Sequence, residues 1–427
     1  MRLEEYLDGV ERDEAADRRR LAEEKSYAIL DHLEDVETSF EECLTGGDLY
    51  GSTAPEIFVG RSSYPEVSTG VLSPVERSAD PAAYATSGEW YQRGLGIESV
   101  LQYRTGLLNT QRSARVDVHD VWDGFVGTQR EVAIADRPVD VEVGLADTPE
   151  FDLSVDDVAT PTGPRARATD ATLAENPHVP PAVEKTLGDD EWRAEGAMTY
   201  LYRRGFDVYE INTILSAGAL GRGPNRRLVP TRWSITAVDD AVGRYLRGRI
   251  RGAETLSEVE VWHNEYMGNR YWIVLAPGRW EFELVEMKAP ESVWNPTGET
   301  HYLASAHEGY EGRSGYVDET AGAYYAARLG VLEHLSERDR QAKCLVLREV
   351  TDAYWAPVGV WQVREGVRHA FDDAADLSED IAGRPGHAET VGAAIDRLVA
   401  RELPISKSAL RRKSTLVAGR QAGLEDF

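Results

Sequence analysis

Residues 258–285 contain three runs in which apolar and polar residues alternate, separated by two glycine-containing turns. Alternation with a period of two places one set of side chains on each face of a β-sheet. Short turns of this kind join neighbouring antiparallel strands. The segment therefore predicts an antiparallel three-stranded meander. The runs are Glu258–Trp262, Arg270–Leu275 and Trp280–Val285, with Gly268 and Gly278 in the turns.

Helical patterns accompany these strands. Residues 1–45 are charged, and their apolar residues recur at spacings of three and four, which predicts a long amphipathic helix. Residues 57–72 predict short strands, and another helix follows Asp318, with small residues that allow close packing. The sequence therefore predicts an α+β fold with mixed or antiparallel sheets, packed helices, a long N-terminal helix and a flexible C-terminal tail.

The chain has 427 residues, more than one compact core usually holds. A proline and glycine break at residues 290–300 and an acidic, weakly periodic stretch at 373–387 suggest boundaries. A single sheet that spans both sides of residues 290–300 would contradict a division there. We expect a large domain at 1–290 with a mobile insertion at about 147–180, a smaller domain at 300–405, and a basic tail at 406–427.

The charge balance indicates the working environment. The formal net charge is −27, from 74 acidic and 47 basic residues. Only six of the basic residues are lysines, so the other 41 are arginines. An acidic, lysine-poor surface fits a halophilic protein, because molar salt screens self-repulsion within about 3 Å. Phosphate contacts weaken as salt rises, so binding to DNA would need a local basic patch or a protein partner.

Several classes of protein are excluded. The sequence has no apolar run long enough to cross a membrane and no secretory signal at its N-terminus, so we expect a cytoplasmic protein. Cys43 and Cys344 are the only cysteines, which excludes a disulfide framework and a four-cysteine zinc site. Cys344 lies in an apolar run and is expected to be buried. No P-loop motif is present, and no cofactor or metal is predicted.

The final seven residues, Gln421–Phe427, fit the spacing Gln-x-x-Leu-x-x-Phe, which matches the clamp-binding peptide called the PIP motif. In one tight turn Leu424 and Phe427 project the same way and can enter one apolar pocket, while the Gln421 amide bonds beside it. Such a peptide folds on contact with its partner. We therefore expect the sliding clamp (PCNA) as a partner, and residues 404–427 to pack poorly on the body.

With this tail, five internal segments resemble the archaeal Nre family of DNA repair proteins, most clearly its NreA branch. The resemblance covers nearly the whole chain. It implies a role in DNA damage repair, clamp binding through the tail, and N- and C-terminal-type domains at 1–290 and 300–405. It implies no reaction. The zinc element of some members is not carried over, because its cysteines are missing. The segments are Ile57–Pro65, Asn176–His178, Val229–Ser234, Asn264–Trp272 and Tyr316–Tyr324.

Several polar residues are candidates for chemistry or binding. Arg226, Arg227 and Arg232 form a basic cluster that can hold a phosphate, although salt bridges to nearby carboxylates are the simpler interpretation. We expect Arg61, Arg232 and Arg270 to line one cleft. The catalytic candidates are Arg61, Arg232, His263, Glu265, Asn269 and Arg270, and the tentative nucleic-acid contacts are Arg411, Arg412, Lys413 and Arg420.

Three functional hypotheses follow. The first is a clamp-recruited repair factor whose body binds damaged or branched DNA. The second is a nucleotide- or nucleic-acid-modifying enzyme recruited in the same way. The third is a non-catalytic adaptor that brings another repair protein to the clamp. A cleft that unites the six candidates would favour the enzyme, whereas their dispersal in surface salt bridges would favour the adaptor.

Overall fold

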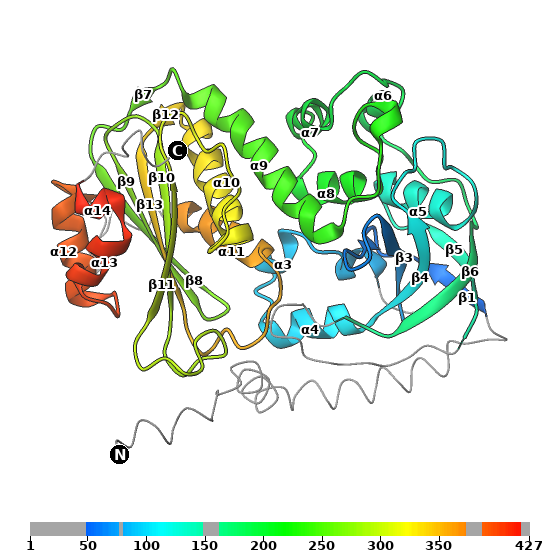
Figure 1. Cartoon of the computed structure of the whole chain (residues 1–427), viewed down its shortest axis with the longest axis horizontal. Helices are drawn as coiled ribbons and strands as arrows, with labels where there is room; N and C mark the ends of the chain where they lie inside the picture. Colours follow the sequence, from blue (N-terminus) through cyan, green and yellow to red (C-terminus); the bar gives the residue numbers. More distant parts are fainter. Residues whose placement is uncertain (1–47, 77–79, 148–161, 373–386, 420–427) are drawn as a thin grey trace, which may run out of the picture.

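The computed structural model describes residues 48–76, 80–147, 162–372 and 387–419, and it contains two six-stranded sheets with helices packed around them (Figure 1). The α+β class predicted from the sequence is confirmed. The helix predicted within residues 1–45 lies outside the described residues. A further two-stranded sheet joins β7 (Glu254–Thr255) to β12 (Arg340–Gln341).

The first sheet has the strand order β1-β5-β6-β4-β3-β2 and occupies the half of the molecule seen on the right of Figure 1. Its neighbours are antiparallel except β4 and β6, which are parallel. Helix α5 (Gly124–Ile134) packs Phe125 and Val132 into the core of this half. The strands are β1 (Asp48–Ser52), β2 (Ile57–Val59), β3 (Glu66–Pro74), β4 (Leu107–Arg115), β5 (Asp140–Leu145) and β6 (Arg165–Leu173).

Strand β6 corrects the insertion expected at about 147–180. Residues 165–173 lie inside the first sheet, between β5 and β4, and bury Ala166 and Ala171. Alanine and threonine gave this segment too weak an apolar pattern to be recognised as a strand. Residues 148–161 lie outside the described residues.

The second sheet has the order β11-β10-β13-β9-β8-β14. Strands β10 and β13 are parallel, and every other pair of neighbours is antiparallel. The β8–β9 hairpin and the strand at Glu281–Lys288 are found where the sequence predicted strands. The strands are β8 (Val259–Tyr266), β9 (Asn269–Ala276), β10 (Glu281–Lys288), β11 (Tyr302–Glu308), β13 (Lys343–Val350) and β14 (His387–Ala388).

The predicted meander is wrong at its third strand, because β13 lies between β9 and β10. Apolar alternation reports that a segment is a strand but does not report its neighbour. The sheet also contradicts the independent packing of two domains divided at residues 290–300, since β10 and β11 pair directly across that stretch. Its proline and glycine mark a long hairpin loop rather than a linker.

Helices cover both faces of the second sheet, so this half has three layers (Figure 1). Tyr271 and Ile273 of β9 face the core shared with α9–α11, whereas Trp272 and Val274 face α12–α14. Cys344 is fully buried in the first of these cores, as predicted. The helices are α9 (Thr231–Ile250), α10 (Ala321–Glu337), α11 (Trp361–Arg368), α12 (Val391–Arg401), α13 (Lys407–Lys413) and α14 (Thr415–Ala418).

The segment 404–419 packs on the body, which corrects the expectation of a loose tail for these residues. Leu410 is fully buried against the second sheet. The Glu283 carboxylate of β10 accepts bonds from the Ser414 hydroxyl (2.6 Å) and the Thr415 N–H (2.8 Å). Ser406 and Ser414 are the N-caps of α13 and α14 and so help to order this segment. Residues 420–427, with the clamp motif, lie outside the described residues.

Shorter elements connect the two halves. The N-cap Asp207 forms a capping box with Glu210 and fixes the start of α8. These connecting elements are η2 (Pro81–Tyr84), α3 (Glu89–Gln92), α4 (Ile97–Thr105), α6 (Pro181–Leu187), α7 (Ala194–Arg203), α8 (Val208–Ser216) and η3 (Gly223–Asn225).

Candidate functional site: a cleft between the two sheets

A cleft of about 1530 Å³ lies between the half built on the first sheet and the half built on the second. Its lining comes from β2 and the following loop, α3, α8 and the start of α9 on one side. The other side consists of the ends of β10 and β13 and the starts of α10 and α11. A cleft of this size between two packed halves is where ligand sites are usually found.

The parallel strands β10 and β13 of the second sheet have their carboxyl ends at this cleft. Strand β10, helix α10 and strand β13 form a crossover in which the two strands are parallel, and the cleft-lining residues Lys288 and Arg348 lie at or near their carboxyl ends. Ligands in open sheets of this kind bind outside the carboxyl ends of the strands. The topology therefore favours this cleft as a site.

Helices α9, α10 and α11 all begin at the cleft and run away from it in the same direction. Residues of each first turn line the cleft. Further along, Asp240 of α9 bonds to Arg328 of α10 at 2.9 Å, and Gly330 of α10 lies against Val367 of α11. Three helix N-termini thus meet at the cleft, each with a partial positive charge and with first-turn N–H groups that have no acceptor among the described residues.

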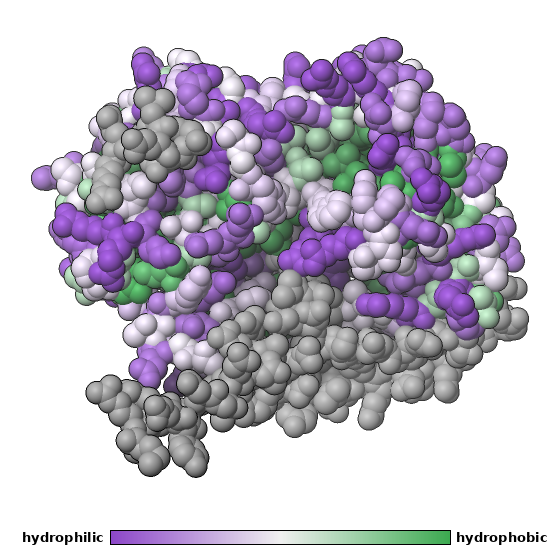
Figure 2. All heavy atoms as spheres, viewed as in Figure 1, coloured by the Kyte–Doolittle hydropathy of each residue, from purple (hydrophilic) through white to green (hydrophobic). Residues whose placement is uncertain are grey.

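Exposed aromatic side chains gather at the mouth of the cleft. Trp233 (45% exposed) and Tyr316 (59% exposed) line it. Tyr64 (43% exposed) packs on Trp233 with ring centroids 5.4 Å apart, and Tyr316 stacks on Tyr325 at 5.7 Å. Figure 2 shows hydrophobic residues among polar ones where the two halves meet. Large aromatic rings left open to solvent in a cleft are typical of surfaces that stack on a ligand.

The side chains of two arginines at this mouth have no partner among the described residues. Arg61 follows β2 and Arg232 begins α9, and both are exposed and line the cleft. Neither guanidinium group forms a hydrogen bond or ion pair with another residue in the part of the chain that the structure describes. The backbone N–H of Val59 donates to the Thr231 hydroxyl at 3.0 Å, which holds the loop that carries Arg61 against the start of α9.

Three other cleft-lining arginines, Arg104, Arg348 and Arg364, pair with carboxylates, whereas Arg165 donates to the Thr162 hydroxyl at 3.0 Å. Arg104 pairs with Glu56 at 3.6 Å. Arg348 bonds to Glu286 and also donates to the Asn269 side chain at 2.7 Å. The cleft therefore contains both paired and unpaired guanidinium groups, and the unpaired ones are available to an anionic ligand.

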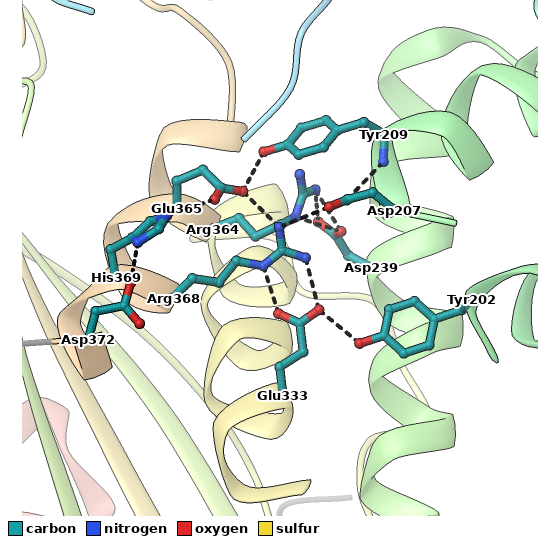
Figure 3. A network of polar contacts seen from close by, with 10 residues as sticks. All are labelled: Tyr202, Asp207, Tyr209, Asp239, Glu333, Arg364, Glu365, Arg368, His369 and Asp372. Carbon is teal, nitrogen blue, oxygen red and sulfur yellow. Dashed lines mark hydrogen bonds and ion pairs between the residues drawn. The ribbon is translucent and has the colours of Figure 1, made fainter. Parts of the chain in front are cut away.

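A buried polar network lies behind the cleft and joins the helices that form it (Figure 3). Arg364 of α11 donates to both carboxylate oxygens of Asp239 of α9, at 2.6 and 2.8 Å. Arg368 of α11 donates to Glu333 of α10 at 2.7 and 2.8 Å. Both carboxylates and both guanidinium groups are largely removed from water, so this network ties the three helices together.

Glu365 of α11 extends the network to α8. Its carboxylate accepts bonds from the Tyr209 hydroxyl at 2.7 Å and from Arg368 at 2.8 Å. Burial raises the pKa of the Glu365 carboxyl, but the hydrogen bond from His369, the charge of Arg368 and the Tyr209 bond lower it to about 2. The hydrogen bond between His369 and Glu365 raises the pKa of His369, whereas burial lowers it. Glu365 is therefore a structural anion rather than a proton donor near neutral pH.

The six catalytic candidates from the sequence fall into separate places. Arg61 and Arg232 lie together at the cleft mouth, whereas Arg270 is not among the lining residues, so the expectation that all three line one cleft is wrong for Arg270. Arg270 pairs with Glu265 at 3.3 Å and with Glu349 at 3.4 Å. Asn269 is buried against Arg348, and His263 packs on the Trp272 ring. The enzyme assembled from all six residues therefore loses its support.

The rest of the basic cluster has structural roles. Arg226 is buried and donates to backbone carbonyls of Thr186, Leu187 and Gly221. Arg227 pairs with Asp117 at 3.3 Å. Arg411, Arg412 and Lys413 are exposed on α13, away from the cleft, and Arg420 lies outside the described residues.

Sequence reasoning pointed to Tyr64 beside Arg61 but missed Trp233 and Tyr316 at the mouth and Thr320 at the start of α10. Trp233 follows Arg232 directly in the sequence, and Tyr316 begins one of the segments that carry the family resemblance. An Arg-Trp pair after a proline at a helix start is a usable signal for a binding surface. Within the described residues, no group of three or more His, Cys, Asp or Glu side chains could hold a metal ion. None of the described helices combines the length and the apolar character needed to cross a membrane.

Comparisons with known proteins cover nearly the whole chain. Residues 21–295 match the family described as "Archaeal Nre, N-terminal", and residues 308–427 match "Archaeal Nre, C-terminal". The gap between them contains the second part of the β10–β11 loop and most of β11. No solved structure matches the chain.

Three relatives are named as DNA repair proteins. A protein of Haloferax volcanii named "DNA repair protein NreA" is 63% identical over 431 residues, covering 100% of both chains. A protein of the same name from Archaeoglobus fulgidus is 40% identical, covering 77% of this chain and 81% of its own. The "DNA repair protein NreB" of Archaeoglobus fulgidus is 36% identical, covering 89% and 92%.

Proposed function

This chain belongs to the archaeal Nre family, and from that membership and the cleft we propose a DNA repair protein that binds DNA between its two sheets and is recruited to the sliding clamp PCNA by Gln421–Phe427. Relatives named as DNA repair proteins support the repair role. The finer parts of the proposal, DNA in the cleft and PCNA at the tail, have separate supports and separate tests.

The observation that carries DNA binding is the pairing of exposed aromatic rings with free arginines at one place. The chain carries a net charge of −27, and a cation that lacks a carboxylate partner among the described residues and lies in the cleft can contact a DNA phosphate. Arg61 and Arg232 are such cations, and Trp233 and Tyr64 lie beside them. Single strands and unpaired bases are bound by this combination, in which bases stack on aromatic rings and arginines contact phosphates.

Stacking also suits the salt conditions that the composition predicts. Phosphate contacts alone lose affinity steeply as salt rises. Apolar contact between a base and a ring is not screened by salt. We therefore infer a preference for single-stranded or branched DNA, whose bases can reach Trp233, over intact duplex.

The test is fluorescence anisotropy with the full-length protein in molar salt, using a single strand, a forked duplex and a blunt duplex of the same sequence. The single strand and the fork should bind more tightly than the blunt duplex. Equal binding of all three, or binding of none, would remove the DNA-binding part of the proposal.

Clamp recruitment rests on the spacing of Gln421, Leu424 and Phe427, which places two apolar side chains and one amide on the same side of a tight turn. Phe427→Ala should weaken clamp binding by about 2 kcal/mol or more, as expected for an aromatic anchor in a desolvated pocket. A pull-down with purified PCNA in molar salt compares the intact protein, Phe427→Ala and a truncation after Arg420. Equal capture of all three would refute recruitment by this motif.

A further inference from the structure

Three backbone N–H groups and one hydroxyl of residues that line the cleft have no hydrogen-bond partner in the described part of the chain. Ala321 and Gly322 begin the 17-residue helix α10, and no described residue accepts from their N–H groups. Trp361 begins α11 beside them, and its N–H group likewise has no described acceptor. N–H groups without an acceptor in the first turn of a helix are suited to bind an anion.

The two helix starts are in direct contact. A side chain at Gly322 would place its Cβ 2.8 Å from the Val360 side chain, which immediately precedes α11. Glycine at this position therefore allows the first turn of α10 to lie against the first turn of α11. Their partial positive charges act on the same small volume, so an anion there interacts with both.

Thr320 provides an independent observation. This N-cap residue lines the cleft and is only 4% exposed, yet its hydroxyl has no hydrogen-bond partner in the described structure and does not cap its own helix. A buried hydroxyl without a partner costs folding free energy, and such groups are usually satisfied. A hydroxyl left unpaired beside unpaired N–H groups is suited to a ligand that supplies acceptor oxygens.

We propose that Thr320 and the first turns of α10 and α11 form a phosphate-binding site that takes a terminal phosphate group. A phosphate has only acceptor oxygens at the surface it presents, which complements a site made of N–H and O–H donors. A terminal phosphate carries nearly two charges, so it gains more from the same partial charges than a bridging diester does. In DNA this group is the phosphorylated end of a strand.

The carboxylates around this site are consistent with the assignment. Glu286 is neutralised by Arg348, and Asp240 by Arg328. Glu319, next to Thr320, is exposed in the same cleft without a partner among the described residues. Its charge opposes a bound phosphate, so removing that charge should strengthen binding rather than weaken it.

This inference rests on the proposed function for its preferred ligand, a DNA end, but the same chemistry occurs in a free nucleotide. The experiment therefore uses three probes with the full-length protein in molar salt. They are a single-stranded oligonucleotide with a 5′-phosphate, the same oligonucleotide with a 5′-hydroxyl, and AMP. Anisotropy measures the two oligonucleotides and calorimetry measures AMP.

We expect the phosphorylated oligonucleotide to bind about tenfold more tightly than its 5′-hydroxyl counterpart, the size of effect given by paired helix N-termini. Thr320→Val keeps the shape of the side chain and should remove most of this preference, without changing the affinity for the 5′-hydroxyl oligonucleotide. Glu319→Gln should raise the affinity for the phosphorylated probe about fivefold. The melting temperature of Thr320→Val should not fall, because its hydroxyl makes no bond to lose.

The outcomes separate the two proposals. If both oligonucleotides bind equally and neither substitution changes the affinity for either, the phosphate site is wrong while DNA binding stands. If neither oligonucleotide binds but AMP binds and responds to both substitutions, DNA binding is wrong while the phosphate site stands. If no probe binds, both are wrong.

Discussion

Helix α9 carries an arginine at the mouth of the cleft and an aspartate in the interior, and the surroundings of the two differ sharply. At the mouth, Arg232 is exposed and unpaired within the described structure. Two turns further along, Asp239 is fully buried and is held by two donors of Arg364. The interior polar contacts involve residues of α7 to α11, and each group labelled in Figure 3 bonds to at least one other.

The comparison separates structural from binding arginines by a physical criterion. A buried charge must be paired, because desolvating it alone costs several kcal/mol. An exposed arginine has no such requirement, but among 74 acidic residues it easily finds a carboxylate. Among the described residues the side chains of Arg61, Arg232 and Arg249 pair with none, and of these three Arg61 and Arg232 line the cleft, where exposed aromatic rings lie beside them. Substitutions in the interior network should therefore change the stability of the protein, and substitutions at the mouth of the cleft should change ligand binding.

The largest effect is expected in the interior. Arg364→Met leaves the Asp239 carboxylate buried without a partner and should lower the free energy of unfolding by about 3–5 kcal/mol. Urea unfolding followed by circular dichroism measures this. The double variant Asp239→Asn with Arg364→Met should recover part of the loss, because the buried charge is gone. Arg232→Met is the matched control on the surface and should change stability by less than about 0.5 kcal/mol.

The next effect depends on pH and concerns Glu365. Its pKa of about 2 in the folded protein lies below the ordinary value of 4.5, so the unfolded chain binds the proton more tightly. The resulting stabilisation, about 3 kcal/mol, is complete above the ordinary pKa and is lost as pH falls towards 2.

Urea unfolding of the wild type and Glu365→Gln between pH 6 and pH 3 tests this value. Glu365 should account for a loss of about 2 kcal/mol by pH 3, and the glutamine variant should lack that part of the decline. Identical slopes for the two proteins would mean that Glu365 has no depressed pKa. His369 acts in the opposite direction, because its raised pKa makes its contribution disappear as pH rises.

In this protein the sequence predicts which segments form helices and strands better than it predicts which segments are neighbours in space. The β8–β9 hairpin follows from alternation and a glycine turn, both encoded within a few residues. The insertion of β13 between β9 and β10 depends on contacts about 70 residues apart, for which alternation carries no information. The α14 cap shows the same limit, since nothing near Ser414 in the sequence indicates that Glu283 of a distant strand accepts a hydrogen bond from its hydroxyl.

The candidate site was predictable only in part for a related reason. Arg61 and Arg232 stand out because each lies beside an aromatic or proline in a loop or at a helix start, and these local features place them at the cleft. Arg270 has the same residue type and a similar setting in the sequence, but Glu265 lies across the hairpin from it and neutralises it. The sequence gives no indication of Thr320, because only the folded structure shows that its buried hydroxyl has no hydrogen-bond partner among the described residues.

A smaller effect is expected when an exposed aromatic residue at the mouth of the cleft is replaced. Trp233→Ala should weaken binding of single-stranded DNA by about 1–3 kcal/mol, the usual contribution of one base stacked on a ring. Tyr50→Ala is the matched control, since Tyr50 is 58% exposed on β1 and does not line the cleft. Anisotropy in molar salt measures both variants. A loss for Tyr50→Ala as large as that for Trp233→Ala would show that exposed aromatic residues are not selective for the cleft.

The smallest effect concerns the unpaired arginines themselves, and it appears in salt dependence more clearly than in affinity. An arginine that neutralises a phosphate of a single strand contributes about 0.7 to the slope of log K against log salt. Arg61→Ala and Arg232→Ala should each reduce this slope by about that amount and should leave the urea unfolding curve unchanged within about 0.5 kcal/mol.

Arg249 provides the control for that last measurement, because it is exposed in the final turn of α9, has no ion pair among the described residues and lies at the opposite end of the helix from Arg232. It shares the residue type, the helix and the exposure, and it differs only in its distance from the cleft. Arg249→Ala should keep the wild-type slope. If all three substitutions change the slope equally, general charge rather than the cleft mouth determines binding; if none does, Arg61 and Arg232 contact no phosphate.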